Sequence, residues 1–565
     1  MKTIEHNVDF CVVGGGLAGV CAAIAAARNG LRVVLMQDRP VLGGNASEEI
    51  RMWICGAHGD NNRETGIIEE LQLENFYRNP QLSYPVWDSV VYEKAYLQPG
   101  LTLLLNCTCQ KAEMDNGRIV SVTGWQMTSE TYHTVKATLF ADCSGDSILA
   151  PLTGAHYRHG RESRAEFGES IAPEKADSCT MGLSCLFQIR ETPEPQPFIK
   201  PEWAYTFPRD EDMPYREHDI SSNYWWIELG GDKDSIHDTD SLRHELLKIA
   251  FGVWDHVKNQ GDHGADNWVM DWIGFLPGKR ESRRYEGAYI VNQHDVEAGG
   301  VFPDVVAYAG WTMDDHFPEG FGYKAGYPTI YHPAPSPWGI PWRSLYSVNI
   351  PNLLFAGRNI SVTHAALSSS RVMATCGLLG QAVGTGAALA LRQGVDPCGV
   401  DIHRLQQQLL RDDCFLPGVA RELPALTREA AVSDEILRDG WERDYAGKNH
   451  AWEGAPGESV SYSFAAPRMV QRVRLVFDSH LNRIYHNMPC MYPMKETLYK
   501  LPSSLVRAYR LIGVVNGQER VLAEVSDNRQ RLVWHQVDAE VESIRLQPLS
   551  TWGAPVCRIF SMDVE

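Results

Sequence analysis

The sequence predicts an α/β domain with a parallel sheet, an α+β domain inserted into it, and an antiparallel β-sandwich near the C-terminus. An apolar strand at the start runs into a glycine-rich turn and an alanine-rich helix. Alternation of strand and helix stops after about residue 165 and resumes near residue 346, and short alternating runs begin near residue 430. At 565 residues the chain is too long for one hydrophobic core. We therefore expect the α/β domain at residues 1–165 and 346–425, the inserted domain at 166–345 and the sandwich at 430–565.

The first strand, turn and helix have the spacing of a Rossmann-like dinucleotide-binding unit. Gly14, Gly16 and Gly19 follow the apolar strand. In this context Gly14 makes a tight turn, Gly16 lets the backbone approach a pyrophosphate, and Gly19 lets the helix pack closely against the strand. Leu17 and Ala18 begin the helix, whose N-terminal amides would receive the diphosphate.

Composition excludes several partner classes. The formal net charge of -19 argues against nucleic acid and anionic membranes, which favour clustered Lys and Arg. The N-terminus lacks the apolar core of a signal peptide, and no run of about 18 apolar residues is present. The 13 cysteines show no CxxC spacing, so we expect neither a metal centre nor a redox disulfide. These features favour a cytoplasmic protein.

Three further segments favour FAD over NAD as the nucleotide. The loop at residues 39–47 carries paired glycines, which suit a backbone that lies against a bulky cofactor. A later strand ends in residues 142–146, which would meet the same edge of the sheet. The turn at residues 357–359 and the apolar helix from about Thr375 would supply a distant contact to the same extended molecule. A second glycine motif of the same spacing is absent, so a separate NAD(P)H domain is not expected.

Three longer stretches carry a family resemblance. Residues 39–57 have the sequence RPVLGGNASEEIRMWICGA, residues 276–291 the sequence LPGKRESRRYEGAYIV, and residues 352–381 the sequence NLLFAGRNISVTHAALSSSRVMATCGLLGQ. Together they resemble the FAD-dependent oxidoreductase family of glutathione-reductase-like flavoproteins, over roughly residues 5–395. The resemblance implies an FAD-binding domain of the glutathione-reductase type, in which the late helix points its N-terminus at the flavin. The reaction is not specified by these motifs.

The glycine unit, the loops and the resemblance together define the expected FAD-binding residues. The resemblance implies that Gly357 and Arg358 lie near the diphosphate or the ribityl chain, and that the segment from Gly380 to Ala382 lies near the flavin ring. The expected set is Gly14, Gly16, Leu17, Ala18, Gly19, Gln37, Asp38, Arg39, Gly43, Gly44, Asn45, Ala46, Ser47, Cys143, Ser144, Gly145, Asp146, Gly357, Arg358, Gly380, Gln381 and Ala382.

One position departs from the family pattern. Many flavoproteins of this fold end the second strand in Glu, which binds the adenosine ribose, whereas this chain has Gln37 followed by Asp38. Gln37 can hydrogen-bond a hydroxyl, and Asp38 can substitute if the turn rotates. We expect both residues at the ribose.

Hydride transfer to or from a flavin needs polar anchors for the substrate and a group that moves a proton. Arg371 would fix a carboxylate or polarise a carbonyl, and His332 or His364 would act as acid or base. These positions loosely resemble the substrate-binding His and Arg of fumarate-reductase-like flavoproteins. Alternatively, each His is a structural hydrogen-bonding residue, and Arg371 neutralises a helix or the diphosphate. Cys55 or His58 is the candidate for covalent attachment of FAD, against ordinary packing.

Two regional features bear on the substrate. Nine of the 16 tryptophans lie between residues 200 and 345, where aromatic faces and interleaved carboxylates suit a sugar-like substrate, although such clusters more often form a core. The tail is similar in a general way to galactose-binding-like or discoidin-type sandwiches, which bind carbohydrate or serve as oligomer interfaces.

The sequence therefore favours an FAD-dependent oxidoreductase of carbohydrate metabolism. It would move a hydride between FAD and a small polar substrate, such as the CH–OH of a sugar or glycoside, and exchange electrons with a separate acceptor or donor. Two alternatives stay open: a reductase of an activated C=C bond in a carboxylate substrate, and a non-catalytic, flavin-bearing glycan-binding protein. We expect a homo-oligomer without nucleic-acid or membrane partners.

Overall fold

The computed structural model describes residues 1–489 and 500–565. Within this part of the chain the residues form two compact units. The first unit contains Met1–Ala57 and Leu82–Ile402, together with a short stretch that begins at His486.

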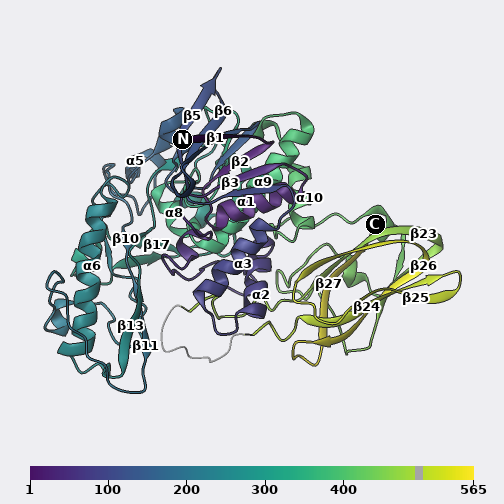
Figure 1. Cartoon of the computed structure of the whole chain (residues 1–565). Coiled ribbons are helices and arrows are strands. Elements are labelled where there is room, and N and C mark those ends of the chain that lie inside the picture. Colours follow the sequence, from purple (N-terminus) through teal and green to yellow (C-terminus); the bar gives the residue numbers. More distant parts are fainter. Residues whose placement is uncertain (490–499) are drawn as a thin grey trace. The chain divides into compact units, whose positions relative to one another are not determined.

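A five-stranded parallel sheet lies at the centre of the first unit (Figure 1). Its strand order is β20-β8-β2-β3-β4. Val13 pairs with Met36 and Asp142, and Asp142 pairs with Phe355, so four strands end at one edge and their loops open at the same place. The strands are β2 (Phe10–Val13), β3 (Val33–Met36), β4 (Leu101–Leu104), β8 (Leu139–Asp142) and β20 (Leu353–Phe355).

Two apolar helices pack against each other beside this sheet, α1 (Leu17–Arg28) and α9 (Met373–Gln393). Small residues permit the close approach: a Cβ on Gly380 would lie 2.0 Å from the carbonyl oxygen of Ala18. In the described part of the chain, α9 is the helix whose length and composition would suffice to cross a membrane, and 94% of its apolar window is buried within the protein. Packing on α1 accounts for that apolar composition.

The rest of the first unit surrounds the parallel sheet. A second sheet has the order β1-β7-β6-β5, with β7 parallel to β1 and antiparallel to β6. Its strands are β1 (Lys2–Asn7), β5 (Cys107–Asp115), β6 (Arg118–Gln126) and β7 (Thr131–Lys136). Helices in this part are α3 (Tyr84–Tyr96), α4 (Leu149–Thr153), α5 (Arg164–Phe167), α7 (Gln293–Glu297) and α8 (His364–Ser370).

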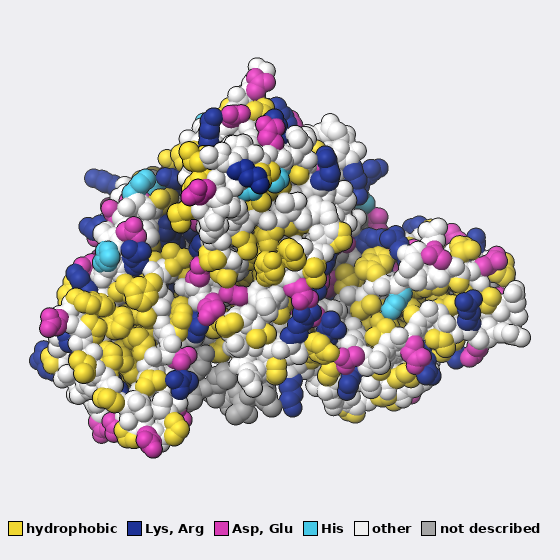
Figure 2. All heavy atoms as spheres, viewed as in Figure 1, with side chains coloured by type: hydrophobic (Ala, Val, Ile, Leu, Met, Phe, Trp, Pro, Cys, Tyr) yellow, Lys and Arg dark blue, Asp and Glu magenta, His cyan; other side chains and the backbone are white. Residues whose placement is uncertain are grey.

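Small antiparallel sheets and one long helix, α6 (Thr239–Asp255), form most of the inserted segment. Hydrophobic side chains gather on the face around α6 (Figure 2), and Trp203 packs edge-on against Phe251 with 5.1 Å between ring centroids. The strands are β9 (Tyr157–Arg158), β10 (Leu183–Ser184), β11 (Phe187–Glu191), β12 (Glu228–Leu229), β13 (Trp268–Ile273), β14 (Gly278–Lys279), β15 (Arg284–Tyr285), β16 (Val305–Ala309), β17 (Met313–His316), β18 (Thr329–His332) and β19 (Trp338–Pro341).

The second unit contains His58–Gln81, His403–Tyr485 and residues 500–565. This division differs from the predicted boundaries, because helix α2 (Ile67–Arg78) and the chain from His403 onward group with the C-terminal strands. Helix α10 (Ile402–Arg411) spans the boundary, and α11 (Ala425–Glu429) follows it.

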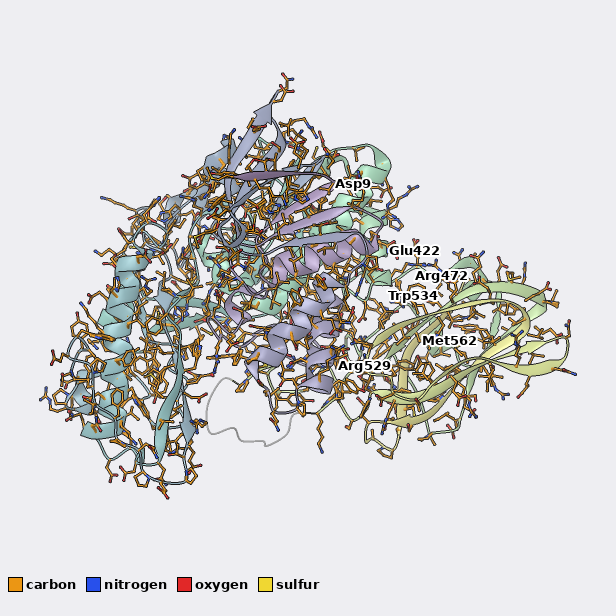
Figure 3. The ribbon with its side chains drawn as sticks, in the orientation of Figure 1. Asp9, Glu422, Arg472, Arg529, Trp534 and Met562 are labelled. Carbon is orange, nitrogen blue, oxygen red and sulfur yellow. The ribbon has the colours of Figure 1, made fainter. Side chains whose placement is uncertain are left out.

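The antiparallel sheet predicted for the tail is confirmed. Seven strands form it, in the order β22-β27-β23-β26-β24-β25 with β21 paired to β23. On its surface the guanidinium of Arg472 lies over the ring of Trp534, 5.4 Å from the centroid, while Met562 is buried (Figure 3). The strands are β21 (Ala431–Val432), β22 (Trp452–Gly454), β23 (Val460–Phe477), β24 (Val506–Val515), β25 (Gln518–Val525), β26 (Leu532–Thr551) and β27 (Cys557–Val564).

Candidate active site

A cavity of about 560 Å³ opens where the strands of the parallel sheet end, and all its lining residues belong to the first unit. One part is lined by the loops after β2, β3, β8 and β20. The other part is lined by the inserted segment and by the start of α9. Of the expected FAD-binding residues, those that line the cavity are Gly14, Gly16, Leu17, Ala18, Gln37, Asp38, Arg39, Gly43, Gly44, Asn45, Cys143, Ser144, Gly145, Asp146, Gly357 and Arg358.

The glycine turn leaves space for a diphosphate. Gly14 has φ +103°, a conformation that only glycine adopts without strain. A Cβ on Gly16 would meet nothing closer than the Cα of Gly44 at 3.9 Å, so the missing side chain leaves open space. The N-terminus of α1 has no side-chain cap, and its first residues, Leu17 and Ala18, line the cavity. Uncapped helix amides are a ready anion site, so these residues fit a dinucleotide.

Both polar atoms of the Gln37 side chain make hydrogen bonds within the protein. Its Oε1 accepts a hydrogen bond from the amide of Gly15 at 2.7 Å, and its Nε2 donates to the carbonyl oxygen of Val41 at 3.1 Å. Gln37 therefore holds the glycine turn in place. Asp38 lines the cavity with a largely exposed carboxylate, so it is the better candidate for the ribose hydroxyls.

Asp146 lies between two cations at the middle of the cavity. Its carboxylate is 2.7 Å from Arg358 Nη2 and 2.6 Å from Lys279 Nζ. Although burial alone would raise it, the pKa of Asp146 is lowered by these two cations. Arg358 and Lys279 therefore keep the Asp146 carboxylate ionised. Arg358 also lines the cavity, and its buried Nε has no hydrogen-bond partner among the described residues.

Six of the expected residues do not line the cavity. Gly19 would place a Cβ 1.8 Å from the carbonyl oxygen of Gly14, so its role is helix–strand packing. Gly380 packs on Ala18 in the same way, about two helical turns after α9 begins at Met373. The six are Gly19, Ala46, Ser47, Gly380, Gln381 and Ala382, all buried.

The start of α9 takes the place that was expected for residues 380–382. Val372, Met373 and Cys376 line the cavity, and α9 has no side-chain cap at its N-terminus. A helix N-terminus carries roughly +0.5 of a charge, which favours electron density on a flavin pyrimidine. The N-terminus of α9 is thus directed at the cavity, as expected. The residues of this helix that line the cavity lie in its first turn and not at residues 380–382. Residues 107–109 also line the cavity and lacked any sequence signal, whereas Lys279 lies in the family-like stretch at residues 276–291 but was not assigned to the site.

Strand β17 brings charged groups to the far part of the cavity. Successive side chains on a strand point to opposite faces, so Asp314 and His316 share one face and Asp315 takes the other. Asp314 and His316 line the cavity, as do Arg371 and Tyr331. His316 Nε2 is 3.4 Å from Asp314 Oδ2, and Arg371 Nη2 is 3.1 Å from the same oxygen.

The buried carboxylate of Glu228 contacts the His316 ring. Its Nδ1 is 2.7 Å from Glu228 Oε2, and Arg280 Nη1 is 3.4 Å from that oxygen. Burial would raise the pKa of Glu228, but Arg280 and His316 lower it, so the carboxylate stays charged. The pKa of Asp314 is likewise lowered, by His316 and Arg371 against burial. Sequence analysis missed both His316 and strand β17; the available signal was the i, i+2 spacing of Asp314 and His316.

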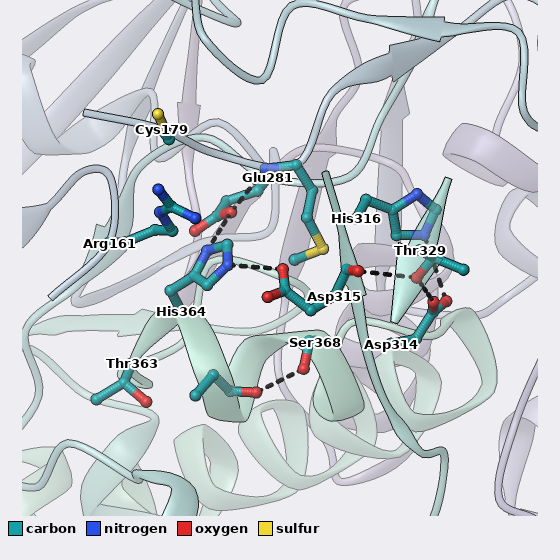
Figure 4. Close-up of polar contacts among 12 residues, drawn as sticks. Arg161, Cys179, Glu281, Asp314, Asp315, His316, Thr329, Thr363, His364 and Ser368 are labelled. Atoms are coloured by element: carbon teal, nitrogen blue, oxygen red, sulfur yellow. Dashed lines mark hydrogen bonds and ion pairs between the residues drawn. The ribbon is translucent and has the colours of Figure 1, made fainter. Parts of the chain in front are cut away.

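His364 takes a position different from the one predicted. It is the first residue of α8 and does not line the cavity. Its Nδ1 lies 2.8 Å from Glu281 and its Nε2 3.0 Å from Asp315, as Figure 4 shows. Burial alone would lower the pKa of His364, but the two carboxylates raise it to about 10. At neutral pH the ring is therefore an imidazolium paired with two carboxylates, an arrangement that favours the alternative of a structural histidine.

His332 also lies away from the cavity lining. It ends β18 and pairs with Met313 across the β17–β18 ladder. Arg371, the third predicted catalytic residue, does line the cavity. Of the three predicted catalytic residues, only Arg371 lines the cavity, and His316, which was not predicted, lines it as well. Cys55 lines the cavity as well, whereas His58 does not.

The tryptophans of the inserted segment divide between cavity and core. Trp225 and Trp311 line the cavity, as does Trp53 from outside the segment. Most of the others are buried in the protein interior, including Trp226, Trp254, Trp268, Trp338 and Trp342. The aromatic enrichment is thus mainly a property of packing, with two rings available to a ligand.

A cavity that joins a diphosphate cradle to a cluster of charged and aromatic groups defines a dinucleotide-dependent enzyme site. A family model described as "FAD dependent oxidoreductase" matches residues 9–409, well over half of the chain. The chain belongs to the FAD-dependent oxidoreductase family, and its cofactor is FAD.

Two curated proteins are similar to parts of the chain. Thiamine thiazole synthase of Thermotoga maritima is 28% identical over 155 residues, which are 25% of this chain and 58% of that protein. NADH:acrylate oxidoreductase of Vibrio harveyi is 52% identical over 44 residues, which are 8% of this chain and 4% of that protein. The matches therefore span less than two thirds of either relative.

Solved structures show weaker likeness. A geranylgeranyl bacteriochlorophyll reductase-like protein from Thermoplasma acidophilum has a TM-score of 0.32 and 12% identity, over 73% of this chain and 85% of that chain. The family 32 carbohydrate-binding module of Streptococcus pneumoniae EndoD has a TM-score of 0.19 and 17% identity, over 24% of this chain and 94% of that chain.

Proposed function

We propose that this flavoenzyme oxidises a CH–OH group of a small, polar, sugar-like substrate. The observation that carries the proposal is the pairing of His316 with buried Glu228 at the cavity wall. The Glu228 carboxylate accepts a hydrogen bond from Nδ1 and fixes the ring, and Nε2 would accept the hydroxyl proton once the substrate oxygen takes the place of Asp314 Oδ2, 3.4 Å from Nε2. FAD, when bound, supplies a hydride acceptor.

The charges around His316 suit a neutral substrate with several hydroxyls. Arg280 and Arg371 are each paired with a carboxylate, Glu228 and Asp314 respectively, so the wall offers donors and acceptors with little net charge. Trp225 and Trp311 add aromatic faces on which the C–H face of a sugar ring can stack.

Arg371, His316 and Asp314 would each have a separate role in the oxidation. Arg371 would donate a hydrogen bond to the reacting oxygen and orient it. His316 would take the hydroxyl proton, and Asp314 would stabilise the imidazolium that forms. The hydride would pass from carbon to FAD while His316 takes the proton from oxygen, and a separate electron acceptor would have to take the two electrons from the cofactor.

Anaerobic mixing with a panel of sugars, polyols and glycosides tests this proposal. Oxidised flavin absorbance should fall to completion with at least one stoichiometric compound. If none of the panel bleaches the flavin while dithionite does, the CH–OH proposal is wrong.

A second candidate is reduction of an activated C=C bond in a carboxylate substrate. Arg280 and Arg371 both line the cavity, and the short Vibrio harveyi match is to a protein named for acrylate. A substrate carboxylate would displace Asp314 from Arg371 and form a two-point contact. Chemically reduced enzyme should then be reoxidised by small enoates and not by the matching saturated acids.

We further propose that the FAD-binding domain is of the glutathione-reductase type. The central position of β2 between β8 and β3, followed directly by the glycine turn and α1, supports this.

A further inference from the structure

We propose a structural transition-metal site, of the zinc class, in the inserted segment. Its ligands are one oxygen of Asp210 and one ring nitrogen each of His218, His256 and His263. These four atoms lie within 4.8 Å of one another. The cysteine pattern had predicted no metal, and the histidines give no signal because they are separated along the chain and meet only in the fold.

Four of the six distances between the ligand atoms lie near those of a tetrahedral site, and all six are within 4.8 Å. His256 Nε2 lies 3.0 Å from Asp210 Oδ1 and 3.0 Å from His263 Nε2. Asp210 Oδ1 is 3.6 Å from His218 Nε2 and 3.7 Å from His263 Nε2. With metal–nitrogen bonds of about 2.0 to 2.1 Å, the edge of a tetrahedron is about 3.3 Å, so all four separations lie near one edge length.

Backbone carbonyls orient two of the rings. His218 Nδ1 bonds to the carbonyl oxygen of Arg216 at 2.5 Å, and His256 Nδ1 bonds to that of Phe207 at 2.6 Å. Each Nδ1 is therefore the donor, and the lone pair of each Nε2 points toward the cluster, as is usual for metal-binding histidines. The fully buried His256 begins a π-helical turn, His256–Gln260, directly after α6; such turns are frequent at functional sites.

The donor set indicates the kind of metal and its role. Three imidazoles and one carboxylate favour zinc or a similar first-row metal over magnesium or calcium. Four protein ligands leave no position for substrate, and none of the four lines the cavity. The Asp210 side chain is 68% exposed, which gives the metal a route from solvent. The metal would link two parts of the inserted segment: the loop that contains Asp210 and His218, and the C-terminal end of α6.

Metal analysis of untagged holoenzyme tests the site. Protein from zinc-supplemented cells should contain about one zinc per chain. After chelation, cobalt should restore one equivalent with the visible absorption of a four-coordinate centre. Chelation should lower the melting temperature, and zinc should restore it.

Variants distinguish a metal site from a hydrogen-bonded histidine cluster. His218→Ala and His263→Ala should each lower the zinc content about tenfold or more while FAD content, a measure of folding, is retained. His237→Ala is the matched control, because His237 lies in the same segment, is exposed and pairs with Asp234 outside the cluster. If wild-type protein holds no zinc and binds no cobalt, or if the double variant His218→Ala/His263→Ala keeps its metal, the proposal is overturned.

Discussion

The buried imidazolium of His364 predicts that stability falls as the solution becomes alkaline. Glu281 and Asp315 hold the pKa of this ring at about 10, against 6.5 for an exposed histidine. The folded protein therefore keeps a proton that the unfolded chain releases near pH 6.5. Stability from this proton is fully present below pH 6.5 and is lost as pH rises to about 10.

The size of the effect follows from the two pKa values. One pH unit corresponds to about 1.4 kcal/mol while the folded state holds one extra proton. The free energy of unfolding should therefore fall by about 2 kcal/mol between about pH 6.5 and 8.5, from this group alone.

Urea unfolding, followed by tryptophan fluorescence at both pH values, measures this loss. His364→Gln removes the titrating group. Between about pH 6.5 and 8.5 the unfolding free energy of this variant should therefore fall by about 2 kcal/mol less than that of the wild type. His237→Gln, on an exposed histidine, should behave as the wild type does. Titrating groups other than His237 and His364 are present in all three proteins, and the His237→Gln control measures the effect of removing an exposed histidine. Equal pH dependence in His364→Gln and the wild type would refute the assignment of His364 as a buried imidazolium.

Three other substitutions have defined outcomes. Gly16→Val should fill the diphosphate cradle without backbone strain, so apoprotein should fold and its FAD content, read from the visible-to-ultraviolet absorbance ratio, should fall to near zero; full FAD content would contradict the cradle. Asp38→Ala should weaken FAD binding about tenfold in fluorescence titrations, as expected for one lost hydrogen bond to a charged group, and unchanged affinity would remove Asp38 from the ribose site. In the second unit Arg483→Ala should cost about 3 to 5 kcal/mol of stability, because the carboxylate of Glu69 would stay buried without its cation; a shift under 1 kcal/mol in chemical denaturation would count against that pair.

Elements with a local signal were predictable from sequence. The glycine turn, the strands around it and the long apolar helix depend on spacing within a few residues, and they occur at β2, α1, β3 and α9. The loops that line the nucleotide part of the cavity followed from the rule that parallel strands end at one edge.

The far part of the cavity was not predictable in the same way. His316 and His364 lie on neighbouring elements and both have carboxylate partners, so composition cannot separate them. Strand alternation in β17 decides which carboxylate faces the cavity, and it turns Asp315 toward His364. The ligand cluster at His256 depends on contacts between segments far apart in sequence, for which no short motif exists.

The rate of anaerobic flavin bleaching by an oxidisable sugar-like substrate tests the central claim most directly. It should be measured in the wild type, His316→Asn and His332→Asn with equal FAD content. We expect bleaching to be about 100-fold to 10,000-fold slower in His316→Asn, because the general base is lost, and unchanged in His332→Asn. Normal bleaching in His316→Asn, or its loss in His332→Asn, would contradict the proposed site.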